Sequence, residues 1–396
     1  MTTELTVAEG RSAVRRLMIA QALAGANSTV IYATGSVIGE GIAPNPALAT
    51  LPISILVVGM ASSTLPAGMI AERYGRRTVF LIGNGFGMAA GLLGALAITM
   101  GSFALFCLAT FFGGVYAAVV LTFRFAAADC VPAAERPRAL AIVLAGGVAA
   151  GIVGSQLVTA TMGLVAGPVF VGTYTASAVV ALLSAIVLGG IKLPRLRAHG
   201  ADRGRPIGEI MRQPLFISAA ICGIISYLLM NFLMTSAPLA MHMEGHQQAA
   251  ADDVIQWHVI AMYAPSFFTG RLITRFGAGK ITAVGLALIA AAAAVGYSGM
   301  TVPHFMGSLI LLGLGWNFGF TGGSAMVLNT HSQDERARVQ SVYDFLVFGS
   351  VAVGSFLSGG ILVSYGWQVV CALAIPPVIA AWAALMRFRA AAPMAA

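Results

Sequence analysis

Long apolar stretches, separated by short polar segments, run through the sequence from end to end. Most of them are interrupted only by Gly, Ser, Thr or Pro. A helix needs about 20 to 25 such residues to cross a bilayer. The pattern therefore predicts twelve transmembrane helices, over 15–39, 47–71, 78–99, 102–124, 137–160, 167–191, 214–240, 254–274, 280–299, 304–328, 337–363 and 366–388.

The composition agrees with a chain that lies mostly in lipid. Apolar residues make up 58% and charged residues 9% of the 396 positions, whereas soluble proteins have about 25% charged residues. The sequence contains no HExxH or GxSxG motif, so we expect no enzyme, no metal and no cofactor. Gly83, Gly87 and Gly91 recur at every fourth position, which indicates close helix packing and not a nucleotide loop.

The basic residues divide sharply between the two sides of the predicted topology. Of 22 Lys and Arg residues, 21 lie in the loops or at the span ends on the side of the N-terminus, and Arg124 lies in the fourth span near the same face. Because Lys and Arg concentrate in cytoplasmic loops, we expect both termini in the cytoplasm. The compact loops suggest a bacterial inner membrane. The net charge of +8 then reflects topology, so the expected partners are lipid and a small-molecule substrate, not nucleic acid. We expect a monomer.

The two halves of the chain repeat each other. The longest polar connection, 192–213, separates residues 1–191 from 214–396. Glu135-Arg-Pro-Arg recurs 200 residues later as Glu335-Arg-Ala-Arg. Gly68, Arg73 and Gly75 recur at an offset of 202. A six-helix unit repeated in parallel is the architecture of one class of transporters, so we predict an all-α membrane protein of two pseudo-symmetric six-helix bundles.

The loop between the second and third spans carries a recognisable motif. Gly68-Met-Ile-Ala-Glu72-Arg73-Tyr-Gly75-Arg76-Arg77 resembles the signature loop of the major facilitator superfamily. In that family the loop locks the cytoplasmic side, with its acid at the N-terminus of span eleven and its basic residues near acids of span four. The resemblance implies a lock built from Gly68, Glu72, Arg73, Gly75, Arg76, Arg124, Asp129 and Arg336. A basic cluster that only sets topology is the alternative.

Two other motifs of the family are missing. Span four has no Arg shortly before a Gly around Phe111–Gly114, and span five has Ser155 where exporters often have Pro after Gly154. The direction of transport therefore stays open. We expect Arg124 to pair with Asp129 or Glu72.

One carboxylate lies well inside an apolar span. Asp344 is nine residues past Glu335, about 13 Å into span eleven. An ionisable residue in the membrane is costly and therefore a functional candidate, either as a proton-binding group or as a structural partner of a neighbouring helix. His258 stands beside Trp257 at the start of span eight, where we expect it in the interfacial aromatic belt.

The neutral polar residues describe a candidate cavity. Spans one and seven, which are equivalent in the two halves, both carry amides and tyrosines. Each residue alone could be interhelical glue; together they suit neutral or weakly cationic organic solutes, including flat ones. The candidate substrate-binding residues are Asn27, Tyr32, Gln156, Tyr227, Asn231, Tyr263, Trp316 and Asn317.

The resulting hypothesis is a secondary active transporter that works by rocker-switch alternating access. Proton coupling through Asp344 is part of that hypothesis. The alternatives are an uncoupled facilitator, a multidrug exporter, and, from another class, a membrane sensor or scaffold that keeps the fold without transport.

Overall fold

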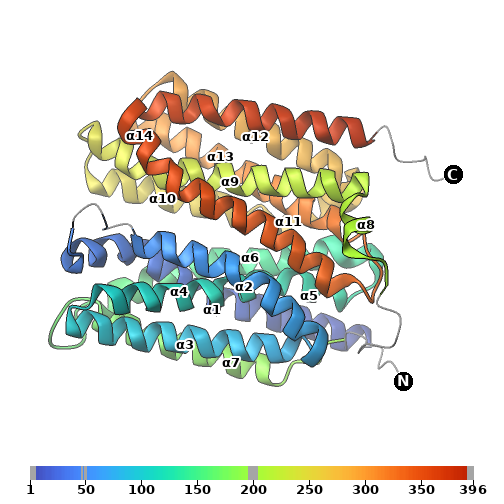
Figure 1. Ribbon diagram of the computed structural model, residues 1–396, viewed down its shortest axis with the longest axis horizontal. Coiled ribbons are helices and arrows are strands. Elements are labelled where there is room, and N and C mark those ends of the chain that lie inside the picture. Colours follow the sequence, from blue (N-terminus) through green and yellow to red (C-terminus); the bar gives the residue numbers. More distant parts are fainter. Residues whose placement is uncertain (1–5, 46–47, 49–50, 195–203, 390–396) are drawn as a thin grey trace. The chain divides into compact units, whose positions relative to one another are not determined.

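The computed structural model describes residues 6–45, 48, 51–194 and 204–389, and it divides into two compact units, Met1–Ala201 and Asp202–Ala396 (Figure 1). The start of the second predicted span and the middle of the central loop lie outside the described residues. Where the sequence suggested a plain loop over 192–213, the described part contains the short helix α8, Ile207–Met211.

Unit 1 is built from six helical spans. Its helices are α1 Val7–Ile42, α2 Leu51–Tyr74, α3 Arg76–Met100, α4 Phe103–Leu121, α5 Phe123–Asp129, α6 Arg136–Thr161 and α7 Val171–Gly189. Helix α1 packs against α6 and α7, α2 against α4, and α3 against α4 and α7. A capping box starts α1, in which the Thr6 hydroxyl accepts from the Glu9 amide and the Glu9 carboxylate accepts from the Thr6 amide.

Unit 2 repeats this plan after α8. Its remaining helices are α9 Pro214–Met243, α10 Gln248–Tyr263, α11 Ser266–Phe276, α12 Ala278–Ser298, α13 Val302–Val327 and α14 Arg336–Arg389. Helix α13 packs against α9, α10 and α12, and α14 packs against α9 and α12. Helix α14 contains two of the predicted spans, which meet at Gly366 with a left-handed φ of 81°.

Each predicted span coincides with described helix, and two spans contain a break that the sequence pattern did not predict. Span four divides into α4 and α5 at Thr122. Span eight divides into α10 and α11 at Pro265, because proline cannot donate to the preceding turn and its ring crowds that turn. Among the described residues, nine helical stretches are long and apolar enough by themselves to cross a membrane.

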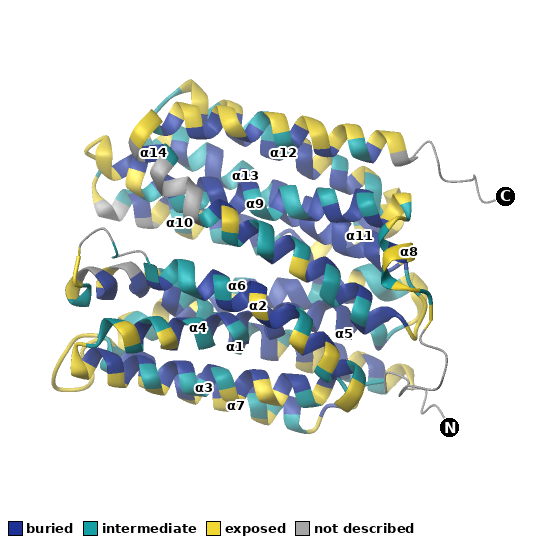
Figure 2. Ribbon diagram, in the orientation of Figure 1, coloured by how far each residue is buried: buried dark blue, intermediate teal, exposed yellow. Residues whose placement is uncertain are grey.

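Exposed residues occur along the helices of both units (Figure 2), and many of them are large and apolar. On α3 these include Leu92, which is 55% exposed, and on α14 they include Ile379, which is 63% exposed. An apolar surface of this extent is disfavoured in water. It is the surface expected of an integral, multi-pass membrane protein.

The glycines of α3 allow close helix contact, as predicted. A Cβ at Gly87 would lie 2.4 Å from the Tyr116 ring of α4, and one at Gly91 would lie 2.6 Å from the Tyr174 carbonyl oxygen of α7. Gly75 and Gly277 have a different role: they precede α3 and α12 with φ of 85° and 88°. Residues with a Cβ rarely adopt this conformation, so the repeated motif requires glycine at the turn.

Candidate functional site

An aromatic cluster occupies the interior of unit 2. The Tyr227 ring of α9 meets Trp316 edge-on at 5.6 Å, Phe320 at 5.1 Å and Phe348 at 5.4 Å between centroids. Tyr263 of α10 meets Trp316 edge-on at 5.5 Å. Trp316 and Phe320, one turn apart on α13, stack at 5.3 Å. Four helices thus contribute rings, and three residues of the predicted cavity, Tyr227, Tyr263 and Trp316, lie together.

Two hydrogen-bond donors beside this cluster have no acceptor among the described residues. Trp316 is fully buried and its Nε1 is unpaired, and Asn231 is 3% exposed with its Nδ2 unpaired. Asn231 lies one turn after Tyr227, on the same face of α9. A buried donor without an acceptor costs about 1–3 kcal/mol, so the arrangement favours a ligand that brings acceptor oxygens or nitrogens.

Asn317 follows Trp316 in the sequence, but its side-chain amide already forms hydrogen bonds within the protein. Its Oδ1 accepts from the Thr269 hydroxyl at 2.7 Å, and its Nδ2 donates to the Met262 carbonyl at 2.7 Å and to the Ser266 hydroxyl at 2.6 Å. These bonds join α13 to both sides of the break at Pro265. The geometry of Asn317 supports a packing role.

The unit 1 candidates lie on two adjoining helices. Asn27 on α1 is 6% exposed, and neither its amide nitrogen nor its amide oxygen has a partner among the described residues. Tyr32, also on α1, is half-buried, and Gln156 on α6 is exposed. Asn27 therefore has the same property as Asn231 in unit 2, a buried amide in the first span of its unit that lacks partners.

Asp344 lies on the face of α14 that reaches the aromatic cluster. It is 1% exposed and precedes Phe348 by one turn, and Phe348 contacts Tyr227. The carboxylate predicted well inside a span is therefore buried one helical turn from a ring of the cluster.

A buried ion pair anchors the signature loop. Arg76 donates to Asp129 at 2.7 Å, and both side chains are 6% exposed. Gly68 is buried in α2, Glu72 is half-buried, and Arg73 is exposed and lies over the Tyr74 ring. The contact between a basic loop residue and an acid just past span four is therefore present, and the locking role stays a prediction.

Two further arginines predicted at this gate are buried. Arg124 is fully buried in α5, lies over the Phe125 ring and donates to the Leu121 carbonyl. Arg336 is 6% exposed at the start of α14 and donates to the Gln333 carbonyl.

His258 was expected in the interfacial aromatic belt, and this expectation was wrong. The imidazole is fully buried and its Nδ1 bonds the Leu309 carbonyl of α13 at 2.7 Å. Trp257 is the exposed neighbour, at 52%. A helix turns 100° per residue, so adjacent residues face different surroundings.

Two rings that complete the cluster, Phe320 and Phe348, were not among the predicted residues. Both lie four residues after a singled-out residue, Trp316 and Asp344, and this helical spacing was the available signal. An ion pair between Arg205, ahead of α8, and Glu335, ahead of α14, at 2.7 Å, was also not predicted. Partners 130 residues apart leave no local pattern.

The chain matches known proteins over most of its length. The pattern of the Major Facilitator Superfamily matches residues 17–255 and 219–395. The riboflavin transporter RfnT of Brucella anthropi is 45% identical over 365 residues, which cover 91% of this chain and 92% of that protein. An uncharacterised transporter of the Major Facilitator Superfamily type from Bacillus subtilis, YdeG, is 29% identical over 87% of this chain and 84% of its own length.

Solved structures with the same fold are much more distant in sequence. The human organic anion transporter MFSD10 superimposes with a TM-score of 0.78 at 13% identity, covering 95% of this chain and 99% of that one. The E. coli fucose:proton symporter FucP gives a TM-score of 0.74 at 13% identity, with 98% and 99% covered. At these identities the likeness concerns the fold. Together with the family match and the closely similar relative, it shows that this chain is a transporter that belongs to the Major Facilitator Superfamily.

Proposed function

We propose that this protein carries a flat, uncharged heteroaromatic solute of the flavin type across the membrane by alternating access, with riboflavin as the substrate to test first. The observation that carries the proposal is the 45% identity to a riboflavin transporter over 91% of the chain. Riboflavin is neutral near pH 7, which agrees with a candidate cavity whose residues are mainly amides, hydroxyls and aromatic rings.

The aromatic cluster of unit 2 supplies groups that suit such a solute. A tricyclic flavin ring offers two faces for aromatic contact and a pyrimidine edge with two carbonyl oxygens. Tyr227 and Tyr263 are only half-buried and would contact the ring faces. The unpaired donors Trp316 Nε1 and Asn231 Nδ2 would donate to its carbonyl oxygens or ring nitrogens.

The first experiment measures uptake of radiolabelled riboflavin into vesicles reconstituted with the purified protein, against unlabelled competitors of neutral, cationic and anionic classes. Riboflavin and close flavin analogues should compete, and an anionic metabolite should not. Equal competition by many unrelated flat cations would instead support a multidrug exporter.

The role of the indole is tested by Trp316→Phe, which keeps an aromatic ring and removes the donor. A hydrogen bond is worth about 1 kcal/mol, so the apparent affinity for riboflavin should fall roughly five- to tenfold. Trp382→Phe is the matched control, because that indole is 47% exposed on α14 and bonds the Ala283 carbonyl. Equal effects of both substitutions would remove Trp316 from the site.

We propose Asp344 as the proton-binding group of a coupled transporter. Support comes from its burial on α14, one turn before Phe348 of the aromatic cluster, and from the high cost of an ionisable group in the membrane. An imposed proton gradient should drive accumulation by the wild type, and Asp344→Asn should exchange substrate but not accumulate it. If uptake by the wild type does not depend on the proton gradient, the protein is an uncoupled facilitator.

We also propose that the loop 68–77 works as a conformational lock in a cytoplasmic position, with both termini on that side. Glu72→Gln should abolish exchange and leave riboflavin binding intact, because the substitution changes the balance between conformations and not the cavity. Glu244→Gln removes an exposed carboxylate and serves as the control. A Glu72→Gln protein that exchanges normally would contradict the lock, and the loop would then only set the topology of the chain.

A further inference from the structure

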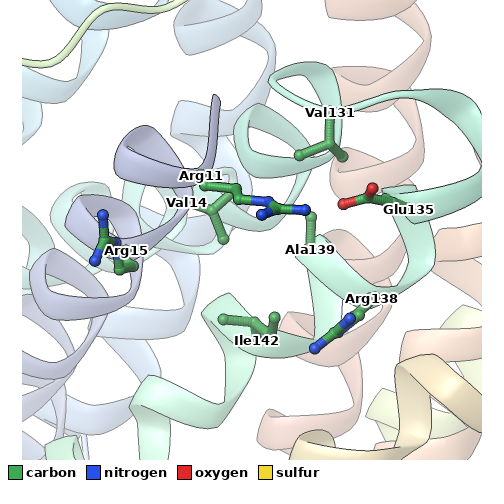
Figure 3. Close-up of a pocket in the computed structure, with 8 residues that line it drawn as sticks. All are labelled: Arg11, Val14, Arg15, Val131, Glu135, Arg138, Ala139 and Ile142. Atoms are coloured by element: carbon green, nitrogen blue, oxygen red, sulfur yellow. The ribbon is translucent and has the colours of Figure 1, made fainter. Parts of the chain in front are cut away.

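A cavity of about 620 Å³ opens in unit 1 near the N-terminal ends of α1 and α6 (Figure 3). Its lining residues are Arg11, Val14, Arg15, Val131, Glu135, Arg138, Ala139 and Ile142. We call it the arginine cavity. Figure 3 shows Arg11 and Glu135 extending toward each other from opposite walls, with Arg138 beside Ile142 at the other end. No part of the proposed substrate site lies among these residues.

The arginine cavity carries an excess of positive charge. Three guanidinium groups and one carboxylate line it, which leaves two positive charges in excess. Within the described part of the chain, none of these four side chains forms an ion pair. Helix α6 begins at Arg136 without a side-chain cap, so the partial positive charge of its N-terminus adds to the same field. The three arginines are exposed, and their excess positive charge would attract an anion.

The other half of the lining is apolar. Val14, Val131, Ala139 and Ile142 lie among the charged residues. A cavity with guanidinium groups beside aliphatic walls, at the end of two membrane helices, matches an amphiphile with a phosphate head and a hydrocarbon chain. Basic pockets between transmembrane helices commonly hold such head groups, and arginine binds phosphate through paired N–H groups.

We propose that the arginine cavity is a binding site for a phosphate group, occupied in the membrane by the head group of an acidic phospholipid whose acyl chain lies on the apolar wall. A soluble phosphate ester presents the same head group without the chain. The site is independent of the transported solute, and its occupant would neutralise the start of α1 and of α6 together.

The test uses full-length protein in nanodiscs of phosphatidylcholine, with or without added phosphatidylglycerol or cardiolipin. Native mass spectrometry counts retained acidic lipids, and a thermal melt gives the unfolding midpoint. Each basic residue near the surface contributes about 1 kcal/mol to acidic-lipid binding. The Arg11→Gln, Arg138→Gln double variant should therefore retain acidic lipid at least roughly tenfold less well, and its midpoint should no longer rise with acidic lipid.

The matched control is the Arg271→Gln, Arg387→Gln double variant, which removes the same charge from exposed positions of unit 2. It should bind acidic lipid like the wild type. An equal loss in both double variants would mean general attraction to a basic surface, and it would overturn the proposal. So would acidic-lipid retention by the cavity variant at the wild-type level. A melt in phosphatidylcholine alone verifies that both variants are folded.

Glycerol phosphate added to phosphatidylcholine nanodiscs distinguishes the two sources of phosphate. If it leaves the wild-type midpoint unchanged while acidic lipid raises it, the acyl chain contributes and the lipid is the occupant. A rise with glycerol phosphate that the cavity variant lacks supports the phosphate site with a soluble ligand. Ile142→Ala sharpens the distinction, because it should weaken lipid retention and leave any response to glycerol phosphate intact.

Discussion

The loops ahead of α6 and α14 share the sequence Glu-Arg-x-Arg, yet their glutamates have different surroundings. In unit 2 the Glu335 carboxylate is 3% exposed and accepts from the Arg205 guanidinium at 2.7 and 2.9 Å. It also accepts from the backbone amides of Arg205 and Ser332, each at 2.9 Å. In unit 1 the Glu135 side chain is half-buried at the edge of the arginine cavity, and no described residue pairs with it.

The difference arises from the central segment and not from the repeat. Residues 204–213 lie in unit 2, where Arg205 and Gln213 also donate to the Thr330 carbonyl and Arg338 donates to the Arg205 carbonyl. Unit 1 receives no equivalent segment within the described residues. The two copies of the repeat therefore carry the same charges, but the central segment provides an ion-pair partner, Arg205, only for Glu335 of unit 2. The other copy is left with uncompensated arginines and an open cavity.

The largest expected effect comes from removing the paired acid. Glu335→Gln should lower the free energy of unfolding by about 2 kcal/mol, because it replaces several hydrogen bonds to a charged, buried carboxylate. Glu135→Gln should change it by less than about 0.5 kcal/mol, as expected of a group without an ion pair. Thermal or denaturant melts in detergent measure both. Equal losses of unfolding free energy in the two variants would contradict the difference between Glu335 and Glu135.

The next effect concerns the backbone that presents Arg205. Gly204 has a φ of 62°, and a Cβ there would lie 2.7 Å from the Glu335 Cγ. Gly204→Ala should cost about 1–2 kcal/mol for the left-handed conformation alone. Gly208→Ala, in α8 where a Cβ meets nothing within 4 Å, should be neutral or slightly stabilising. Identical melting midpoints for the two alanine variants would show that the contact of residues 204–205 with Glu335 does not stabilise the protein.

A smaller effect should appear on acidification. The Arg205 guanidinium holds the pKa of Glu335 well below its usual value of 4.5, with help from the backbone amides of Ser332 and Arg205. A carboxyl whose pKa is lowered in the folded state stabilises above its unfolded pKa, and this contribution is lost as the pH falls toward the folded pKa. Wild-type stability should therefore decline below about pH 4 more steeply than that of Glu335→Gln. Parallel pH profiles of melting midpoint would contradict this assignment.

The smallest effect is expected at the other end of the linker. Lys192 donates to Glu9 at 2.9 Å, but the two side chains are 73% and 35% exposed. Lys192 and the Thr6 cap lower the pKa of Glu9 to about 2. Lys192→Gln should raise that pKa and leave the melting midpoint unchanged within error, because exposed pairs contribute little. A clear drop in the midpoint would show that the linker is held at both ends.

Much of the fold could be predicted from the sequence, because lipid requires long apolar helices and the repeat fixes their grouping. Gly75, singled out as part of the signature loop, has a positive φ. The helix break at Pro265 is caused by the proline itself, which a hydropathy pattern does not register. The helix break at Thr122 has no comparable residue that would have predicted it.

The candidate site was predictable in kind and less so in detail. Tyr227, Tyr263 and Trp316 were singled out and lie together, since polar and aromatic residues within apolar helices are few. Whether a polar side chain already has a hydrogen-bond partner depends on contacts between segments that are distant in the sequence. Asn231 keeps an unpaired donor and Asn317 does not, although both are asparagines in the interior of a span.

Substrate counterflow tests the central claim most directly, because it requires binding and alternating access but no energy source. Vesicles containing the protein are loaded with unlabelled riboflavin and diluted into a trace of labelled riboflavin. The label should accumulate transiently inside the vesicles, and this accumulation should be absent from protein-free vesicles and weakened in Trp316→Phe. Labelled riboflavin that enters no faster than in protein-free vesicles, while the protein in them gives a normal melt, would contradict the central claim.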